Sequence, residues 1–87
     1  MNMCKEFKKA LGENLRKIRL SKTLTQEYVA FESGISRSHI AMIESGKRDV
    51  TISVLFKISR AMNISLKDFF EFDNLDKYKF DIEKLYE

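Results

Sequence analysis

Two short helical segments around a glycine turn, in the middle of the chain, restrict its possible folds more than any other feature. Thr25 and Ser36 are small polar residues of the kind that cap helix N-termini, and each precedes such a segment. Gly34 stands where the first segment needs a left-handed residue in order to stop, and Gly46 ends the second. Ile35, between the segments, is expected to pack as an apolar plug. The sequence therefore predicts two short helices that pack together at this turn.

The rest of the chain also shows helical periodicity. Phe7, Leu11, Leu15 and Ile18 recur at steps of four, four and three residues, which mark one face of a helix. The absence of proline and the presence of only three glycines leave few of the chain reversals that β-hairpins need. The sequence thus predicts an all-α fold of five helices with a further C-terminal helix. The expected bounds are residues 4–21, 26–33, 37–45, 52–62 and 66–72. Residues 74–86 follow as a further amphipathic helix or, alternatively, as a tail that becomes ordered on a partner.

The chain is long enough for one domain with a small core. A domain of these 87 residues buries only roughly 60% of its unfolded surface, so self-association often adds stability. We expect the aromatic side chains to lie in the core rather than to stack on RNA bases; they are Phe7, Tyr28, Phe31 and Phe56. In residues 52–62, the predicted inward face consists of Leu55, Ile58 and Met62.

Neither the cysteine content nor the hydropathy pattern indicates a secreted or membrane protein. Cys4 is the only cysteine, so no disulfide can form within the chain. The sequence contains no signal-peptide core and no apolar run that approaches the ~20 residues of a membrane span. We therefore expect a cytoplasmic protein without a membrane partner, in which Cys4 is an incidental thiol.

The net charge of +3 is mild, but its distribution is uneven. Residues 1–48 contain ten Lys or Arg and five Asp or Glu, whereas residues 49–87 contain six and eight. A basic front half and an acidic rear half suit a module that presents one face to phosphates. Ordinary solvated surface would give the same count, so charge alone leaves both interpretations open.

The segment after the glycine turn carries side chains suited to contacting DNA bases. Arg37 has a planar fork that can bond guanine at two atoms, and Ser38 is short enough to allow close approach. His39 can donate to a phosphate or a base, and Met42 can contact a thymine methyl group or pack partly inside the protein. A recognition helix contacts bases through its first turns. We interpret this segment as the second helix of a helix-turn-helix, with candidate base contacts at Arg37, Ser38, His39 and Met42.

Several runs of this sequence, all in register, resemble the Cro and phage-repressor (XRE-type) helix-turn-helix family. The runs are Leu15-Arg16-Lys17-Ile18-Arg19, Leu24-Thr25-Gln26-Glu27, Gly34-Ile35-Ser36-Arg37-Ser38, Ile40-Ala41-Met42-Ile43-Glu44, Ser45-Gly46-Lys47-Arg48 and residues 55–70. The resemblance implies five helices and binding to DNA as a symmetric dimer. Residues 48–70, with their Phe-Phe-Glu ending, are most similar to restriction–modification controller proteins. The chain departs from the family pattern at Val50, where proline is usual, at Asn63, where glycine is usual, and at Met42, where a polar or basic residue is usual.

The resemblance also assigns roles to individual positions. Gln26 matches a glutamine that contacts phosphate, and its place at a helix start supplies exposed backbone donors for an anion. Arg19 and Glu44 match a partly buried ion pair that joins the first helix to the third. The loop after residue 45 matches one that meets the DNA backbone. The full set of candidate phosphate contacts is Gln26, Ser36, Ser45, Lys47 and Arg48.

The C-terminal part of the chain holds more aromatic residues than one small core needs. We expect residues 1–72 to form the DNA-binding domain and residues 73–87 to form a helical tail that contributes to dimerisation. Packing within one chain is the alternative use of these side chains. The candidate residues for a dimer interface are Phe69, Phe70, Phe72, Leu75, Tyr78, Ile82 and Leu85.

The residues of this chain favour three classes of function to different degrees. The favoured prediction is a regulator that binds double-stranded DNA as a homodimer, with no cofactor, no metal and no evident small-molecule ligand. The alternative is an antitoxin or another protein-interaction module that uses the same fold and an acidic tail. An enzyme is the least favoured, because one histidine, one cysteine and no clustered carboxylates leave no catalytic constellation.

Overall fold

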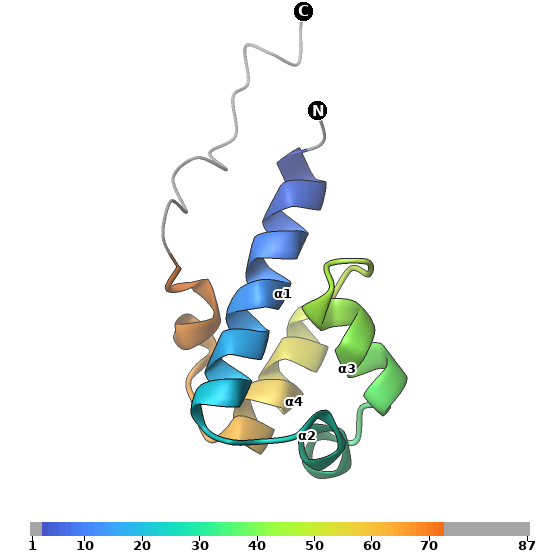
Figure 1. The fold of residues 1–87 in the computed structure, drawn as a ribbon, viewed down its shortest axis with the longest axis vertical. Helices are drawn as coiled ribbons and strands as arrows, with labels where there is room; N and C mark the ends of the chain where they lie inside the picture. The colour runs from blue at the N-terminus through green and yellow to red at the C-terminus, as the bar shows by residue number, and fades with distance from the viewer. Residues whose placement is uncertain (1–2, 73–87) are drawn as a thin grey trace, which may run out of the picture.

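A computed structural model of the chain describes residues 3–72, and all of its regular elements there are helical. They are the α-helices α1 (Met3–Ser21), α2 (Gln26–Ser33), α3 (Arg37–Glu44) and α4 (Ile52–Met62), and the 3₁₀ helix η1 (Leu66–Phe70) (Figure 1). The predicted all-α class is confirmed. The predicted tail helix lies outside the described residues.

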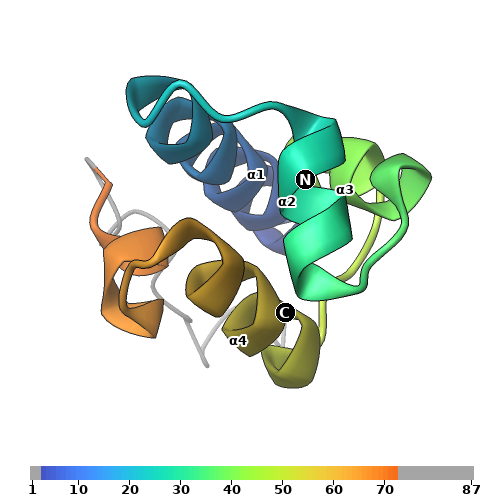
Figure 2. The same cartoon turned by 90° about the horizontal axis from the view of Figure 1, so that it is seen from below.

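The helices pack into a small bundle around a shared apolar core. α1 is the long upright helix, with α3 on one side of it and η1 on the other, and α2 is seen almost end-on (Figure 1). α2 packs against both α3 and α4, while α1 packs against α3 and η1 (Figure 2). The helix-turn-helix formed by α2 and α3 therefore packs against α4 through α2 and against α1 through α3.

The helix ends follow the capping chemistry expected from the sequence. The hydroxyls of Thr25, Ser36 and Thr51 each accept a hydrogen bond from the backbone N–H three residues later. Gly34 stops α2 with φ of 75°, and Asn63 stops α4 with φ of 57°. Thr23 also has φ of 57°, a left-handed conformation that is uncommon for a β-branched residue and that the sequence did not indicate.

Within the described residues the core is mainly aliphatic, and Phe69 is the one aromatic side chain that is fully buried there. Its buried apolar members are Leu11, Leu15, Val29, Ile40, Ile43, Leu55, Ile58, Met62 and Phe69. The prediction of core positions for Tyr28, Phe31 and Phe56 was wrong, because these side chains are 45%, 84% and 53% exposed. Successive helical residues are turned by about 100°, so burial of Val29 in α2 and Leu55 in α4 leaves their neighbours outside. Phe7 is partly buried against the core.

The fifth element differs from the α-helix predicted for residues 66–72, since it is a 3₁₀ helix that ends at Phe70. The side-chain amide of Asn14, in α1, donates to the carbonyl oxygens of Asp68 and Phe69 at 3.2 and 2.8 Å. A continuing α-helix would need those carbonyls for its own backbone bonds. The Asp68 carboxylate also accepts from the Ser65 N–H at 3.0 Å. These bonds account for the short, tight turn, and no local pattern in the sequence indicated the role of Asn14.

Gly12 allows α1 to cross the carboxyl end of α3 at close range. A Cβ atom at this position would collide with the backbone carbonyl oxygens of Ile43 and Glu44. The glycine therefore brings the backbone of α1 directly against the end of the recognition helix. This approach positions α3 for the contacts described below.

Candidate DNA-binding interface

The outer face of α3 holds the residues that the sequence predicted to contact bases. Arg37 and Ser38 are exposed at its first turn, and Met42 is 37% exposed one turn further on. His39 is half-buried, which leaves only part of its ring at the surface. Ile40 and Ile43, on the opposite face, are buried in the core. Buried isoleucines thus anchor the helix while its polar first turn projects outward.

Arg37 is paired with a carboxylate in the absence of DNA. Its Nε lies 2.7 Å from Oε1 of Glu27 in α2, and the two side chains are 63% and 65% exposed. Exposed ion pairs of this kind contribute little to stability, about 0–1 kcal/mol. A DNA phosphate or base can therefore replace Glu27 as the partner of the guanidinium at small cost. The sequence did not indicate this pairing.

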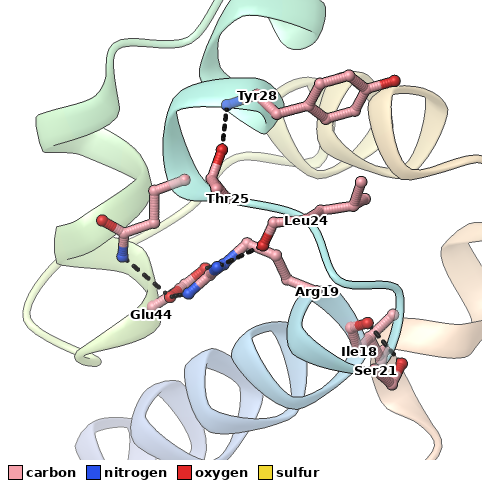
Figure 3. Close-up of polar contacts among 8 residues, drawn as sticks. Ile18, Arg19, Ser21, Leu24, Thr25, Tyr28 and Glu44 are labelled. Carbon is pink, nitrogen blue, oxygen red and sulfur yellow. Dashed lines mark hydrogen bonds and ion pairs between the residues drawn. The ribbon is translucent and has the colours of Figure 1, made fainter.

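A buried polar network fixes α3 relative to α1 and the start of α2. Arg19 donates from Nε and Nη2 to the two carboxylate oxygens of Glu44, at 2.7 and 3.0 Å (Figure 3). Its Nη1 donates to the Leu24 carbonyl oxygen at 2.7 Å, and the Gln26 amide donates to Glu44 at 3.1 Å. The Arg19 and Glu44 side chains are only 8% and 3% exposed. The family resemblance implied this pair, but not the two added bonds that bring in the α1–α2 turn and α2.

The network gives the recognition helix a defined orientation. Bidentate pairing uses the rigid fork of arginine, so it restricts rotation as well as distance. Every polar side-chain atom that is buried in residues 3–72 has a hydrogen-bond partner. Because Glu44 is the last residue of α3, its bonds hold the end of that helix beside the first residue of α2. The two segments predicted to touch DNA are thereby held together.

The residues predicted to contact phosphate fall into two groups: those whose side chains form hydrogen bonds within the protein, and exposed cations without an ion pair in residues 3–72. The side chains of Gln26, Ser36 and Ser45 already form hydrogen bonds within the protein, to Glu44, the His39 N–H and the Met42 carbonyl. Lys47 and Arg48 are exposed, and neither forms an ion pair with the part of the chain that the structure describes. These two cations are the better placed of the five to meet an external anion.

The aromatic side chains predicted for a dimer interface are buried or half-buried within their own chain where the structure describes them. Phe69 is 0% exposed and belongs to the core of its own chain, so its assignment to an interface was wrong. Phe70 and Phe72 are half-buried, and the Phe72 ring lies 6.1 Å from the Phe7 ring, centroid to centroid. The candidates of the tail, namely Leu75, Tyr78, Ile82 and Leu85, lie outside the described residues.

Membrane-spanning helices and clusters of metal ligands are both absent from residues 3–72. No helix in this range combines the length and the apolar character needed to cross a bilayer. The same range holds no group of three or more His, Cys, Asp or Glu side chains that could ligate a metal ion.

Comparison with known proteins agrees with the arrangement of these helices. The sequence is 36% identical over 74 residues to the control protein C.BamHI from Bacillus amyloliquefaciens, across 84% of this chain and 91% of that protein. The fold is similar to the crystal structure of the restriction-modification controller protein C.AhdI from Aeromonas hydrophila, with a TM-score of 0.70 and 35% identity over 71% of this chain and 94% of that one.

A second controller protein has been crystallised with DNA. C.Esp1396I forms a tetramer in complex with its natural 35 base-pair operator, and its fold matches with a TM-score of 0.68 and 36% identity, over 80% of this chain and 90% of that one. The helix-turn-helix family itself matches residues 15–69, which include α2, α3 and α4 in full. With the exposed α3, its glycine turn and its buried ion pair all inside that range, the chain belongs to the helix-turn-helix family.

Proposed function

We propose that this protein is a transcription regulator that binds a near-palindromic DNA site as a homodimer, with α3 of each copy in the major groove. The observation that carries the proposal is the exposed first turn of α3, held in place by the buried Arg19–Glu44 network. A helix fixed in this way can present Arg37 and Ser38 to base edges without first ordering itself.

The relatives support a DNA-binding regulator and favour the controller class. C.BamHI, C.SmaI and C.MunI are all named control proteins, at 36–38% identity. The operator complex of C.Esp1396I supports double-stranded DNA as the ligand and self-association as the mode of binding. In this proposal the protein acts in the cytoplasm, and its own concentration sets the occupancy of the site. Repression or activation then depends on where the site lies relative to a promoter.

The partner copy is proposed to contact α4. Ile52 and Phe56 are four residues apart, so they share one face of that helix, and they are 66% and 53% exposed. Leu55, Ile58 and Met62 occupy a separate, buried face of the same helix. We call Ile52 and Phe56 the α4 ridge. In this proposal a twofold contact along the α4 ridge pairs the two copies, and the α3 helix of each copy is joined to its α4 by a short loop. Burial of such apolar side chains is the usual driving force for association.

Selection of bound sites from random duplex DNA by the purified protein tests the proposal. We expect an enriched motif made of two inverted half-sites whose centres lie about one helical turn, ~10 base pairs, apart. Failure to enrich any motif would contradict sequence-specific binding. A stable complex with another protein from the native host, together with no enriched motif, would instead favour the protein-interaction alternative.

A further inference from the structure

The amino-terminal half of α1 and the loop after α3 form a hollow lined mainly by lysines. Its volume is about 520 Å³, and its lining residues are Lys5, Lys8, Lys9, Ser45, Gly46 and Lys47. Figure 1 shows this part of α1 beside the loop that leaves α3. We refer to these six residues as the lysine hollow.

Close packing of the two backbones builds the hollow. A Cβ atom at Gly46 would approach the Lys9 backbone to 2.6 Å, so the loop lies directly against α1. Lys8 and Lys9 follow Lys5 by three and four residues, which places both of them one turn from Lys5 along the helix. Lys47 reaches the same hollow from the loop. Residues distant in the sequence are thus brought together as one basic surface.

The charge of the hollow is strongly one-sided. Among residues 3–72, four of the six that line it are lysines and none is a carboxylate. Asp49 pairs with Lys8, with Nζ and Oδ1 3.3 Å apart, but its own side chain is 90% exposed and lies outside the lining. Ammonium groups act as point charges without the directional fork of arginine, which suits contact with a phosphate rather than with a base edge.

We propose that the lysine hollow holds a phosphate of the DNA backbone next to the carboxyl end of α3, so that α1 is part of the DNA-binding surface. The inference rests on the proposed function and extends it. Ser45 and Lys47, which line the hollow, are also predicted phosphate contacts, so the hollow is continuous with the interface of the helix-turn-helix. Neither the sequence patterns nor the family resemblance assigned a DNA contact to the first turns of α1.

A matched pair of double variants tests the proposal on the duplex selected from random DNA. Lys5→Ala/Lys9→Ala removes two exposed cations from the hollow, whereas Lys17→Ala/Lys67→Ala removes two exposed cations from outside it. Lys67 lies on η1, on the side of α1 opposite α3 (Figure 1). The second variant therefore controls for net charge.

Salt dependence of the affinity provides the first measurement. The slope of the logarithm of the binding constant against the logarithm of the salt concentration is measured. If both lysines contact phosphates, this slope should be less steep by about two in the hollow variant, because each neutralised phosphate contributes roughly 0.9 to its magnitude. The control variant should keep the slope of the unaltered protein. Circular dichroism checks that both variants fold, and Lys5→Gln/Lys9→Gln repeats the test with longer side chains.

A scan with neutral methylphosphonate linkages, placed one at a time in the duplex, locates the phosphate. The unaltered protein and the control should lose affinity at a position where the hollow variant is insensitive. If all three proteins bind the selected site with the same salt slope and the same scan, the lysine hollow makes no phosphate contact, although the proposed function stands. If the unaltered protein selects no site at all, the proposed function itself has failed.

Discussion

At the scale of single residues, Arg19 and Glu44 determine how rigidly the recognition helix is held. Their side chains are almost wholly buried and satisfy one another through two hydrogen bonds. The transfer of two charges out of water is costly, so such a pair adds orientation more dependably than stability. The pair nevertheless becomes essential once formed, because either charge alone would be left buried without its partner.

The variant Glu44→Gln measures that dependence. It leaves the Arg19 guanidinium buried beside a neutral amide, and we expect the free energy of unfolding to fall by about 3–5 kcal/mol. Chemical denaturation followed by circular dichroism provides the measurement. The double variant Arg19→Met/Glu44→Leu removes both charges and should be less destabilised than the single variant. A loss below about 1 kcal/mol for Glu44→Gln would show that the pair is effectively solvated.

At the scale of elements, the crossing of α1 over α3 is set by Gly12. No side chain separates the two backbones here, because a Cβ atom would meet the carbonyl oxygens at the end of α3. Glycine in the middle of a helix costs roughly 1 kcal/mol relative to alanine. In this fold the cost is offset by the close packing of α1 on α3, which a side chain at this position would prevent.

Gly12→Ala should therefore destabilise the protein despite the better helix propensity of alanine. The added methyl group has to displace backbone atoms, and we expect a net loss of about 1–3 kcal/mol in thermal or chemical unfolding. Glu13→Ala, at the next and exposed position of the same helix, is the control and should change stability by less than about 0.5 kcal/mol. Stabilisation by Gly12→Ala would mean that α1 and α3 are further apart than the structure places them.

The sequence predicted the elements whose signals are local. The caps and left-handed stops around α2, α3 and α4 act within a few residues, so their bounds could be predicted to within one residue. The 3₁₀ form of η1 was missed because it depends on Asn14, which is distant in the sequence. Phe31 and Phe56 were misplaced because hydrophobicity alone does not tell which face of a short helix is covered. The Arg37–Glu27 pair likewise joins two helices whose mutual orientation no local signal specifies.

At the scale of the whole molecule, binding to an inverted repeat requires a second copy in a fixed orientation. Phe69 cannot provide that contact because it fills the core of its own chain. The exposed ridge of Ile52 and Phe56 on α4 is the surface that we propose instead. It lies on the element that follows the recognition helix, so association and DNA binding should be coupled through α4.

Phe56→Glu should weaken both processes together. A charge placed in a self-complementary apolar contact acts twice in the dimer, and we expect the dimerisation constant to fall by more than about 30-fold, ~2 kcal/mol. Sedimentation equilibrium provides the measurement. Phe31→Glu changes a still more exposed phenylalanine, at 84% exposure on α2, and should leave the association unchanged. Equal behaviour of the two variants would remove the α4 ridge from the interface.

The most direct measurement of the central claim compares the motifs that the unaltered protein and Arg37→Ala select from random DNA. If Arg37 of each copy contacts a base, the variant should lose information at one position in each half-site, related by the twofold symmetry, at a cost of about 1–3 kcal/mol on the original site. All other positions of the DNA motif should keep their base preference. An unchanged motif with uniformly weaker binding would show that the opening turn of α3 touches only the DNA backbone, and would contradict the assignment of α3 as the helix that recognises bases.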